Sequence, residues 1–197
     1  MARDSKGGLS MDNFLDVISK NTIIAALNNM ERLDETIESP CKVVFLLTGD
    51  ILNLGPTVDI LKKNEKIVFV HLDLMDGFSR DIIALEYIYK YIGLDGIITT
   101  KPNIVSAAKD LGIFTIQRLF ILDSLALVSG IRSIKSIKPD AVEILPGIMP
   151  RITEEVYNNT RIPIITGGLI KHKKDVIESL KAGAIAISTS SEGVWYM

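Results

Sequence analysis

Eight short runs rich in β-branched residues recur about every 20 to 25 residues, and stretches with helical periodicity separate them. The runs span Thr22–Leu27, Lys42–Thr48, Lys66–Asp73, Gly96–Thr100, Phe114–Phe120, Ala141–Pro146, Ile162–Gly168 and Ala184–Thr189. Strands that alternate with helices pair in parallel through right-handed crossovers, and eight such units favour a barrel over an open sheet. We therefore predict an α/β fold, a compact (β/α)8 TIM-type barrel.

The stretches between these runs predict amphipathic helices. They span Ile51–Asn64, Asp81–Tyr91, Asn103–Leu111, Ser124–Ile137 and Lys173–Ala182. Only SEGVWYM follows Ser190, so the last helix is expected to be truncated. No linker interrupts the pattern, which predicts a single barrel domain over residues 12–197. Its first segment, Asp12–Lys20, has helical character and suits a cap on the barrel floor, whereas residues 1–11 are expected to be a disordered or cloning-derived N-terminus.

Composition narrows the class of protein further. The formal charge of −2 and pI near 5.7 exclude a uniformly basic surface, although a local basic face is still allowed. The single cysteine, Cys41, excludes an intramolecular disulfide and fits a reducing compartment, where a buried structural thiol is expected. No run reaches the roughly 18 apolar residues of a membrane span, and no basic-then-apolar stretch ending in a cleavage site, the pattern of a secretory leader, occurs in the sequence. We expect a cytoplasmic protein.

Strand alternation predicts which side chains point into the barrel. The expected inward residues are Phe69, His71 and Asp73 of the third run, Thr115 and Gln117 of the fifth, and Glu143 of the sixth, with Phe114 and Ile116 facing the helices. His71 is expected to be a satisfied core histidine. Polar groups near the C-terminal ends of barrel strands mark the place where this fold carries its sites.

The last two units hold the strongest local signal, TGG at Thr166–Gly168 and STS at Ser188–Ser190. Barrels often bind phosphate with the loops after strands seven and eight, where glycines allow close backbone approach and a helix N-terminus adds positive partial charge. Alternatively, the glycines turn the chain and the serines cap a helix. The joint position of both motifs favours a phosphate site at Gly167, Gly168, Ser188, Thr189 and Ser190.

Charged and polar residues cluster at the ends of the middle strands. Asp50 and Asp73 are suited to bind polyol hydroxyls, to ligate a metal or to act as acid and base, although Asp50 is nearly as well explained as a helix N-cap. Lys101, Gln117, Arg118 and Glu143 complete the group, and an Arg118–Glu143 or Arg118–Asp123 ion pair is the structural alternative. No zinc-type spacing or nucleophile elbow occurs, so we predict no metal site and no catalytic constellation.

Seven segments carry a resemblance that runs from about Asn21 to Trp195. They read FLLTGDILNLG, VFVHLDLMDGFSRD, DGIITTK, TIQRLFILDSLAL, PDAVEILPGIMP, PIITGGLI and AIAISTSSEGVW. Together they resemble the glycerol uptake operon antiterminator regulatory protein family. TIQRLF…DS and EILPG…P are specific to that family, whereas TGG and STS are shared with many phosphate-binding barrels.

The resemblance implies a small TIM-type barrel that senses glycerol 3-phosphate and, when liganded, binds the leader mRNA of its operon so that transcription passes a terminator. It implies no cofactor. The phosphate would lie on Gly167, Gly168, Ser188, Thr189 and Ser190, and the glycerol part on Asp50, Asp73, Lys101, Gln117, Arg118 and Glu143.

Charge distribution bears on the RNA partner independently. Residues 1–100 carry 10 basic and 15 acidic side chains, whereas residues 101–197 carry 12 basic and 9 acidic ones. The basic residues of the second half include two clusters, Arg132, Lys135 and Lys138 along one predicted helix, and Lys171, Lys173 and Lys174 before another. Such clusters can neutralise nucleic-acid phosphates, and a solvated helix face is the alternative explanation.

Three functions therefore stay open at the level of sequence. The leading hypothesis is a ligand-gated, RNA-binding regulator that performs no chemistry, with assembly into a homo-oligomer left open. The alternative is a TIM-barrel isomerase, aldolase or phosphodiesterase that acts on a small phosphate ester. A third is a metabolite-responsive protein whose partner is another protein. The barrel itself does not decide among them, because it hosts many functions.

Overall fold

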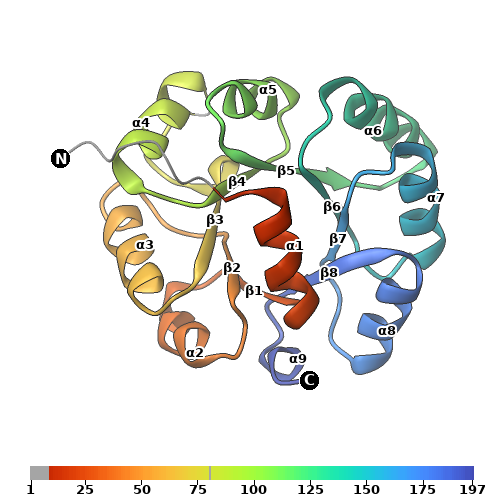
Figure 1. The fold of residues 1–197 in the computed structure, drawn as a ribbon, viewed down its shortest axis with the longest axis horizontal. Helices are drawn as coiled ribbons and strands as arrows, with labels where there is room; N and C mark the ends of the chain where they lie inside the picture. Colours follow the sequence, from red (N-terminus) through yellow and green to blue (C-terminus); the bar gives the residue numbers. More distant parts are fainter. Residues whose placement is uncertain (1–8, 80) are drawn as a thin grey trace.

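The computed structural model describes residues 9–79 and 81–197 and contains a closed barrel of parallel strands in the order β1 to β8 (Figure 1). The strands are β1 (Ile23–Leu27), β2 (Val43–Leu46), β3 (Ile67–His71), β4 (Gly96–Thr99), β5 (Phe114–Phe120), β6 (Ala141–Leu145), β7 (Ile164–Gly167) and β8 (Ala184–Thr189). Each strand lies within the run predicted for it. The TIM-type barrel is therefore confirmed.

Helices ring the barrel in Figure 1 and run back from the C-terminal end of one strand to the start of the next. They are η1 (Met30–Arg32), α2 (Leu33–Glu38), α3 (Leu54–Lys63), η2 (Leu72–Leu74), α4 (Ile82–Ile92), α5 (Pro102–Asp110), α6 (Ser124–Ile137), α7 (Pro150–Thr160), α8 (Lys173–Lys181) and α9 (Glu192–Trp195). Local caps set several starts: the Asp81 and Asp123 carboxylates accept from the amides of Ala84 and Ala126. The expected short last helix is confirmed, because α9 has four residues.

Helix α1 (Met11–Lys20) crosses the N-terminal end of the barrel in Figure 1. Its Phe14 is fully buried and contacts the rings of Phe69 and Phe114, with centroid distances of 5.6 and 4.9 Å. The predicted cap on the barrel floor is confirmed. Most of the predicted disordered stretch 1–11 lies outside the described residues, and Ser10 caps α1 through its side chain.

The predicted facing of β5 is wrong. Phe114 and Ile116 lie inside the barrel, whereas Thr115 and Gln117 face outward. The Asp140 carboxylate accepts from both the amide and the hydroxyl of Thr115, so the outward polar groups are paired. Both faces of a parallel barrel strand are buried, so alternation alone does not reveal which face points inward.

Two further expectations from the sequence concern Cys41 and membrane-spanning helices. Cys41 is fully buried, and burial raises the pKa of its thiol, in keeping with the predicted structural role. No helix among residues 9–79 and 81–197 is long and apolar enough to cross a membrane.

Candidate functional site

A cavity of about 420 Å³ opens at the barrel mouth, the end of the barrel where the strands reach their C-termini. Chain segments after β1, β7 and β8 form much of its wall. Its lining includes six of the residues predicted to bind a ligand, Arg118, Glu143, Gly168, Ser188, Thr189 and Ser190. It also includes Asn28, which was not predicted from the sequence, although a polar residue just after a barrel strand is typical of a site in this fold. Lys171, predicted to bind RNA, lines the cavity as well.

The inner part of the cavity holds a buried ion pair between neighbouring strands. Arg118 Nε donates to Glu143 Oε2 at 2.6 Å, and the two side chains are 5% and 1% exposed. Gly167 lies against the other carboxylate oxygen, because a Cβ at that position would come within 2.7 Å of Glu143 Oε1. A side chain at residue 167 is therefore incompatible with the pair as it stands.

The outer wall is formed by the loops after β7 and β8. Gly168 and Leu169 both have positive φ angles, +75° and +63°, and turn the chain sharply out of β7. The Thr189 hydroxyl donates to the Ile170 carbonyl at 2.8 Å and thereby joins the two loops. Arg32 Nη1 donates to the Ser190 carbonyl at 2.7 Å, which fixes the second loop from outside the cavity.

These contacts modify the predicted phosphate site. The hydroxyls of Ser188 and Ser190 stand at the cavity wall, whereas that of Thr189 already serves the loop. The expected positive helix terminus is weak, since α9 spans only one turn and peptide dipoles add along a helix. The exposed Lys171 supplies a cation at the cavity wall instead.

Four residues predicted for the polyol are placed elsewhere on the mouth or outside it. The Asp50 carboxylate accepts from the amides of Leu52 and Asn53 in a local turn before α3, close to the capping alternative. Gln117 points outward and donates to Ser133 of α6 at 2.9 Å, so its assignment to the mouth is wrong. Lys101, half-buried, immediately precedes α5 on the rim.

The fourth, Asp73, joins the ends of β3 and β4. Its carboxylate accepts from the Thr99 hydroxyl at 2.9 Å and from the amide and hydroxyl of Thr100 at 2.7 and 2.8 Å. Burial opposes ionisation of Asp73, but these hydrogen bonds outweigh it and hold the pKa of the carboxyl below its ordinary value. Asp73 therefore organises the rim.

His71 differs from its predicted state. The ring is 2% exposed, and neither Nδ1 nor Nε2 has a hydrogen-bond partner among the described residues. Burial, assisted by the charge of Arg118, lowers the pKa of His71 to about 4, so the imidazole is neutral at pH 7. The prediction of a satisfied core histidine is wrong.

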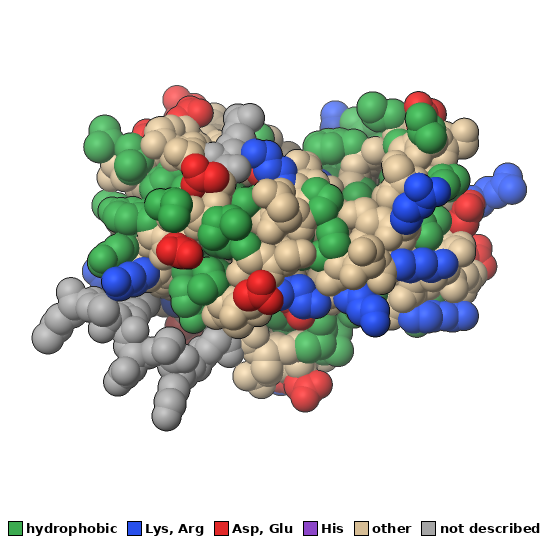
Figure 2. Space-filling model, turned by 90° about the horizontal axis from the view of Figure 1, so that it is seen from above, with side chains coloured by type: hydrophobic (Ala, Val, Ile, Leu, Met, Phe, Trp, Pro, Cys, Tyr) green, Lys and Arg blue, Asp and Glu red, His purple; other side chains and the backbone are tan. Residues whose placement is uncertain are grey.

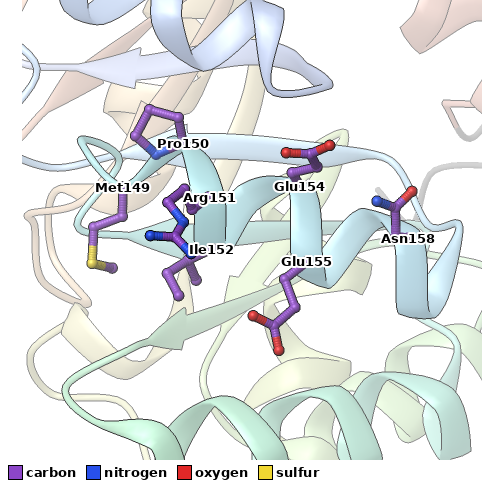
Figure 3. A pocket seen from close by; sticks show the side chains of 7 residues that line it. All are labelled: Met149, Pro150, Arg151, Ile152, Glu154, Glu155 and Asn158. Carbon is purple, nitrogen blue, oxygen red and sulfur yellow. The ribbon is translucent and has the colours of Figure 1, made fainter.

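A second hollow, of about 570 Å³, lies on the outer surface at α7 (Figure 3). Its lining comes from α7 and the residue before it, and in Figure 3 Glu154, Glu155 and Asn158 point away from one another. A binding site needs polar groups that converge on one ligand. The mouth cavity meets this requirement and the α7 hollow does not.

The two basic clusters lie at opposite ends of the barrel. Arg132, Lys135 and Lys138 follow the last part of α6, a 14-residue helix that runs about 21 Å from the mouth towards the floor. Lys171, Lys173 and Lys174 follow β7 and are at the mouth. All six side chains are exposed. Figure 2 shows the face of the molecule formed by α4, α5 and α6, and Lys and Arg side chains gather on it towards α6. The clusters do not form one continuous surface.

Comparison with known families decides the class of protein. The model of the family described as glycerol-3-phosphate responsive antiterminators matches residues 23–195, which includes every strand and the whole mouth cavity. The chain belongs to this antiterminator family. The resemblance noted in the sequence is confirmed.

Individual relatives agree with the family assignment. The chain is 33% identical to the glycerol uptake operon antiterminator regulatory protein from Listeria monocytogenes str. 4b F2365, with a TM-score of 0.86, covering 89% of this chain and 95% of that one. It is 39% identical to a glycerol uptake operon antiterminator-related protein from Thermotoga maritima MSB8, with a TM-score of 0.80 and coverage of 89% and 98%.

A curated relative, the uncharacterized protein YgcP of Escherichia coli K12, is 35% identical over 181 residues, 92% of this chain and 95% of that protein. More distant barrels share the fold alone. The N-acetylmannosamine-6-phosphate 2-epimerase from Clostridium perfringens, for example, is 13% identical with a TM-score of 0.67. Enzymes among these barrels therefore say nothing about the activity of this family member.

Proposed function

We propose that this chain binds glycerol 3-phosphate in the mouth cavity and, when liganded, binds the leader mRNA of a glycerol-utilisation operon in the cytoplasm as a transcription antiterminator. The observation that carries the ligand assignment is the cavity itself. Its outer wall offers Ser190, Gly168 and the cation Lys171 to a phosphate, and Ser188 near the end of β8 adds a hydroxyl beneath them. The buried Arg118–Glu143 pair at its inner part offers charged hydrogen-bonding groups to hydroxyls.

Of the two basic clusters, the one that contains Lys171, Lys173 and Lys174 fits ligand-gated RNA binding better. Lys171 lines the mouth cavity, and α8 begins two residues after it. A ligand that orders this loop therefore acts directly on the basic side chains next to it. The cluster on α6 lies towards the barrel floor, where a ligand at the mouth has no direct contact.

Calorimetric titration and thermal unfolding test the ligand assignment. Glycerol 3-phosphate at 100 times its dissociation constant should stabilise the chain by about 2.7 kcal/mol, while glycerol and inorganic phosphate serve as controls for the two halves of the ligand. Stabilisation by the ester well beyond that by either control supports the proposal. An equal response to inorganic phosphate indicates a general anion site, and no response to the ester contradicts it.

The proposed regulator binds its ligand without changing it. Phosphorus NMR of glycerol 3-phosphate incubated with the protein should show the ester signal undiminished, with no new phosphate species. Catalytic turnover that is lost on replacement of Asp73 or Lys101 would instead support an enzyme that acts on a phosphate ester.

A further inference from the structure

We propose that His71 forms the floor of the ligand site and recognises the terminal hydroxyl of a phosphorylated polyol, selecting it over a carboxylate. The inference rests on the proposed function and adds a residue and a specificity to it. Strand register, an unpaired buried ring and the charge balance of the floor support it independently.

The strand registers place His71 inside the barrel, in a layer of side chains that the mouth cavity reaches. Phe69 lies inside the barrel, so His71, two residues further along β3, faces inward as well. Pairing runs from His71 to Ile98 and on to Ile116. Strands of such a barrel are staggered by about one residue each, and alternate strands contribute the side chains of one layer. Arg118, two residues beyond Ile116, is therefore level with His71.

The same registers complete this layer with Ala26 on β1 and Gly167 on β7. The layer thus holds two polar side chains and two very small residues. In an eight-stranded barrel β7 lies opposite β3, so the His71 ring faces a glycine across the barrel. Ala26 and Arg118 both line the mouth cavity, so the cavity reaches this layer, whereas His71 is 2% exposed and lies behind the residues that line it.

The hydrogen-bonding state of the ring indicates a ligand contact. A buried polar group without a partner is costly, and native structures keep such groups mainly where they have a functional use or bind water or an ion. His71 is 2% exposed, and both its nitrogens lack partners among the described residues. A neutral imidazole offers one donor and one acceptor. An alcohol hydroxyl, which both donates and accepts, satisfies either nitrogen.

The net charge of the side chains around His71 determines which chemical group of a ligand can bind there. Arg118 is neutralised by Glu143 at 2.6 Å, and the imidazole is uncharged at neutral pH. The floor therefore has no net positive charge to offset a carboxylate, and Glu143 would repel one. A hydroxymethyl group brings no charge to this buried place and keeps its hydrogen bonds.

The vertical arrangement suits a short ligand. Gly168 and Lys171 follow Gly167, a member of the His71 layer, by one and four residues, so the loop after β7 rises from this layer to the mouth. Ser190, the first residue after β8, also lies above this layer. One molecule can have its phosphate in the outer loops and its terminal hydroxyl on His71.

Two substitutions and three probes test the inference. His71→Leu removes both polar atoms and keeps similar volume, whereas His71→Gln keeps a donor and an acceptor. Each protein is titrated calorimetrically with glycerol 3-phosphate, inorganic phosphate and 3-phosphoglycerate, in which a carboxylate replaces the terminal hydroxymethyl group. Urea unfolding of each protein establishes that it is folded.

We expect wild-type protein to bind glycerol 3-phosphate at least about tenfold more tightly than 3-phosphoglycerate. The His71→Leu variant should stay folded, bind glycerol 3-phosphate about tenfold or more weakly, and bind inorganic phosphate as the wild-type protein does. The His71→Gln variant should retain part of the affinity for glycerol 3-phosphate. Unchanged binding of the ester by folded His71→Leu overturns the inference and leaves the proposed function intact. A parallel loss of inorganic phosphate also overturns it. Failure of wild-type protein to bind the ester contradicts the proposed function and this inference together.

Discussion

Arg118 on β5 and Glu143 on β6 form a salt bridge of 2.6 Å inside the barrel, and Gly167 on β7 leaves the space that the carboxylate occupies. Residues from three neighbouring strands thus form this buried ion pair and the space around it. The Arg118–Glu143 ion pair was one of the two structural pairings that the sequence allowed for Arg118. Both residues also line the mouth cavity. These two roles can be separated by experiment.

Removing one partner of the pair should be much worse for stability than replacing both. Glu143→Leu leaves Arg118 buried and unpaired, so we expect a loss of about 3–5 kcal/mol in the free energy of unfolding. The double variant Arg118→Met/Glu143→Leu should recover most of this stability and still fail to bind glycerol 3-phosphate. Urea denaturation and calorimetric titration measure the two effects. A double variant that binds the ester normally would remove the pair from the site.

Gly167→Ala tests the space beside Glu143. The added methyl group would meet Glu143 Oε1 at 2.7 Å and must displace it, so we expect a loss of about 1–3 kcal/mol together with weakened ligand binding. Gly193→Ala is the matched control, because a Cβ there meets nothing within 4 Å. Equal stability and affinity of the two alanine variants, measured by thermal unfolding and titration, would argue against this account of residue 167.

His71 should make folding stability depend on pH between about 6.5 and 4. Its folded-state pKa is lowered to about 4, below the value of about 6.5 in an unfolded chain, so the unfolded state takes up the proton first. The stability that the neutral His71 contributes is fully present above about pH 6.5, decreases as the pH falls, and is lost below about pH 4.

The difference between the folded-state pKa of about 4 and the unfolded value corresponds to about 3 kcal/mol in the free energy of unfolding. Asp73, whose pKa is also lowered, contributes stability that is lost only below about pH 4, near the pKa of an unfolded aspartate. Urea unfolding at pH 7 and pH 4.5 should therefore separate wild-type protein from His71→Gln, with His172→Asn as the control at the second histidine. Identical pH dependence of wild-type protein and His71→Gln would contradict the prediction.

Most of the fold was predictable because eight β-branched runs leave few alternatives to a parallel barrel. Which side chains of β5 point into the barrel was not predictable. Both faces of this strand are buried, so the alternation of residues around Gln117 was compatible with either orientation. The state of His71 was also beyond the sequence, because a missing partner depends on what neighbouring strands bring near the ring. The separation of the two basic clusters follows from helix direction and becomes visible only with the topology.

The basic clusters should contribute unequally to RNA binding. Lys173→Glu/Lys174→Glu changes side chains next to the ligand loop, whereas Lys135→Glu/Lys138→Glu changes the same number of charges towards the barrel floor. With glycerol 3-phosphate present, we expect the first pair to weaken leader RNA binding and to lower the salt slope by about 0.7 to 0.9 for each lost phosphate contact. Fluorescence anisotropy over a range of salt concentrations measures both quantities. A larger loss from the second pair would move the RNA surface to α6.

The most direct test of ligand-gated RNA binding is the affinity of the chain for leader RNA with and without saturating glycerol 3-phosphate, paired with the affinity for glycerol 3-phosphate with and without RNA. Coupling between two sites is reciprocal, so the two ratios must be equal. Our account predicts that the ester tightens RNA binding, by about 5- to 150-fold if the coupling is of typical size, and that RNA tightens ester binding by the same factor. Equal RNA affinity in the presence and absence of the ester would contradict it.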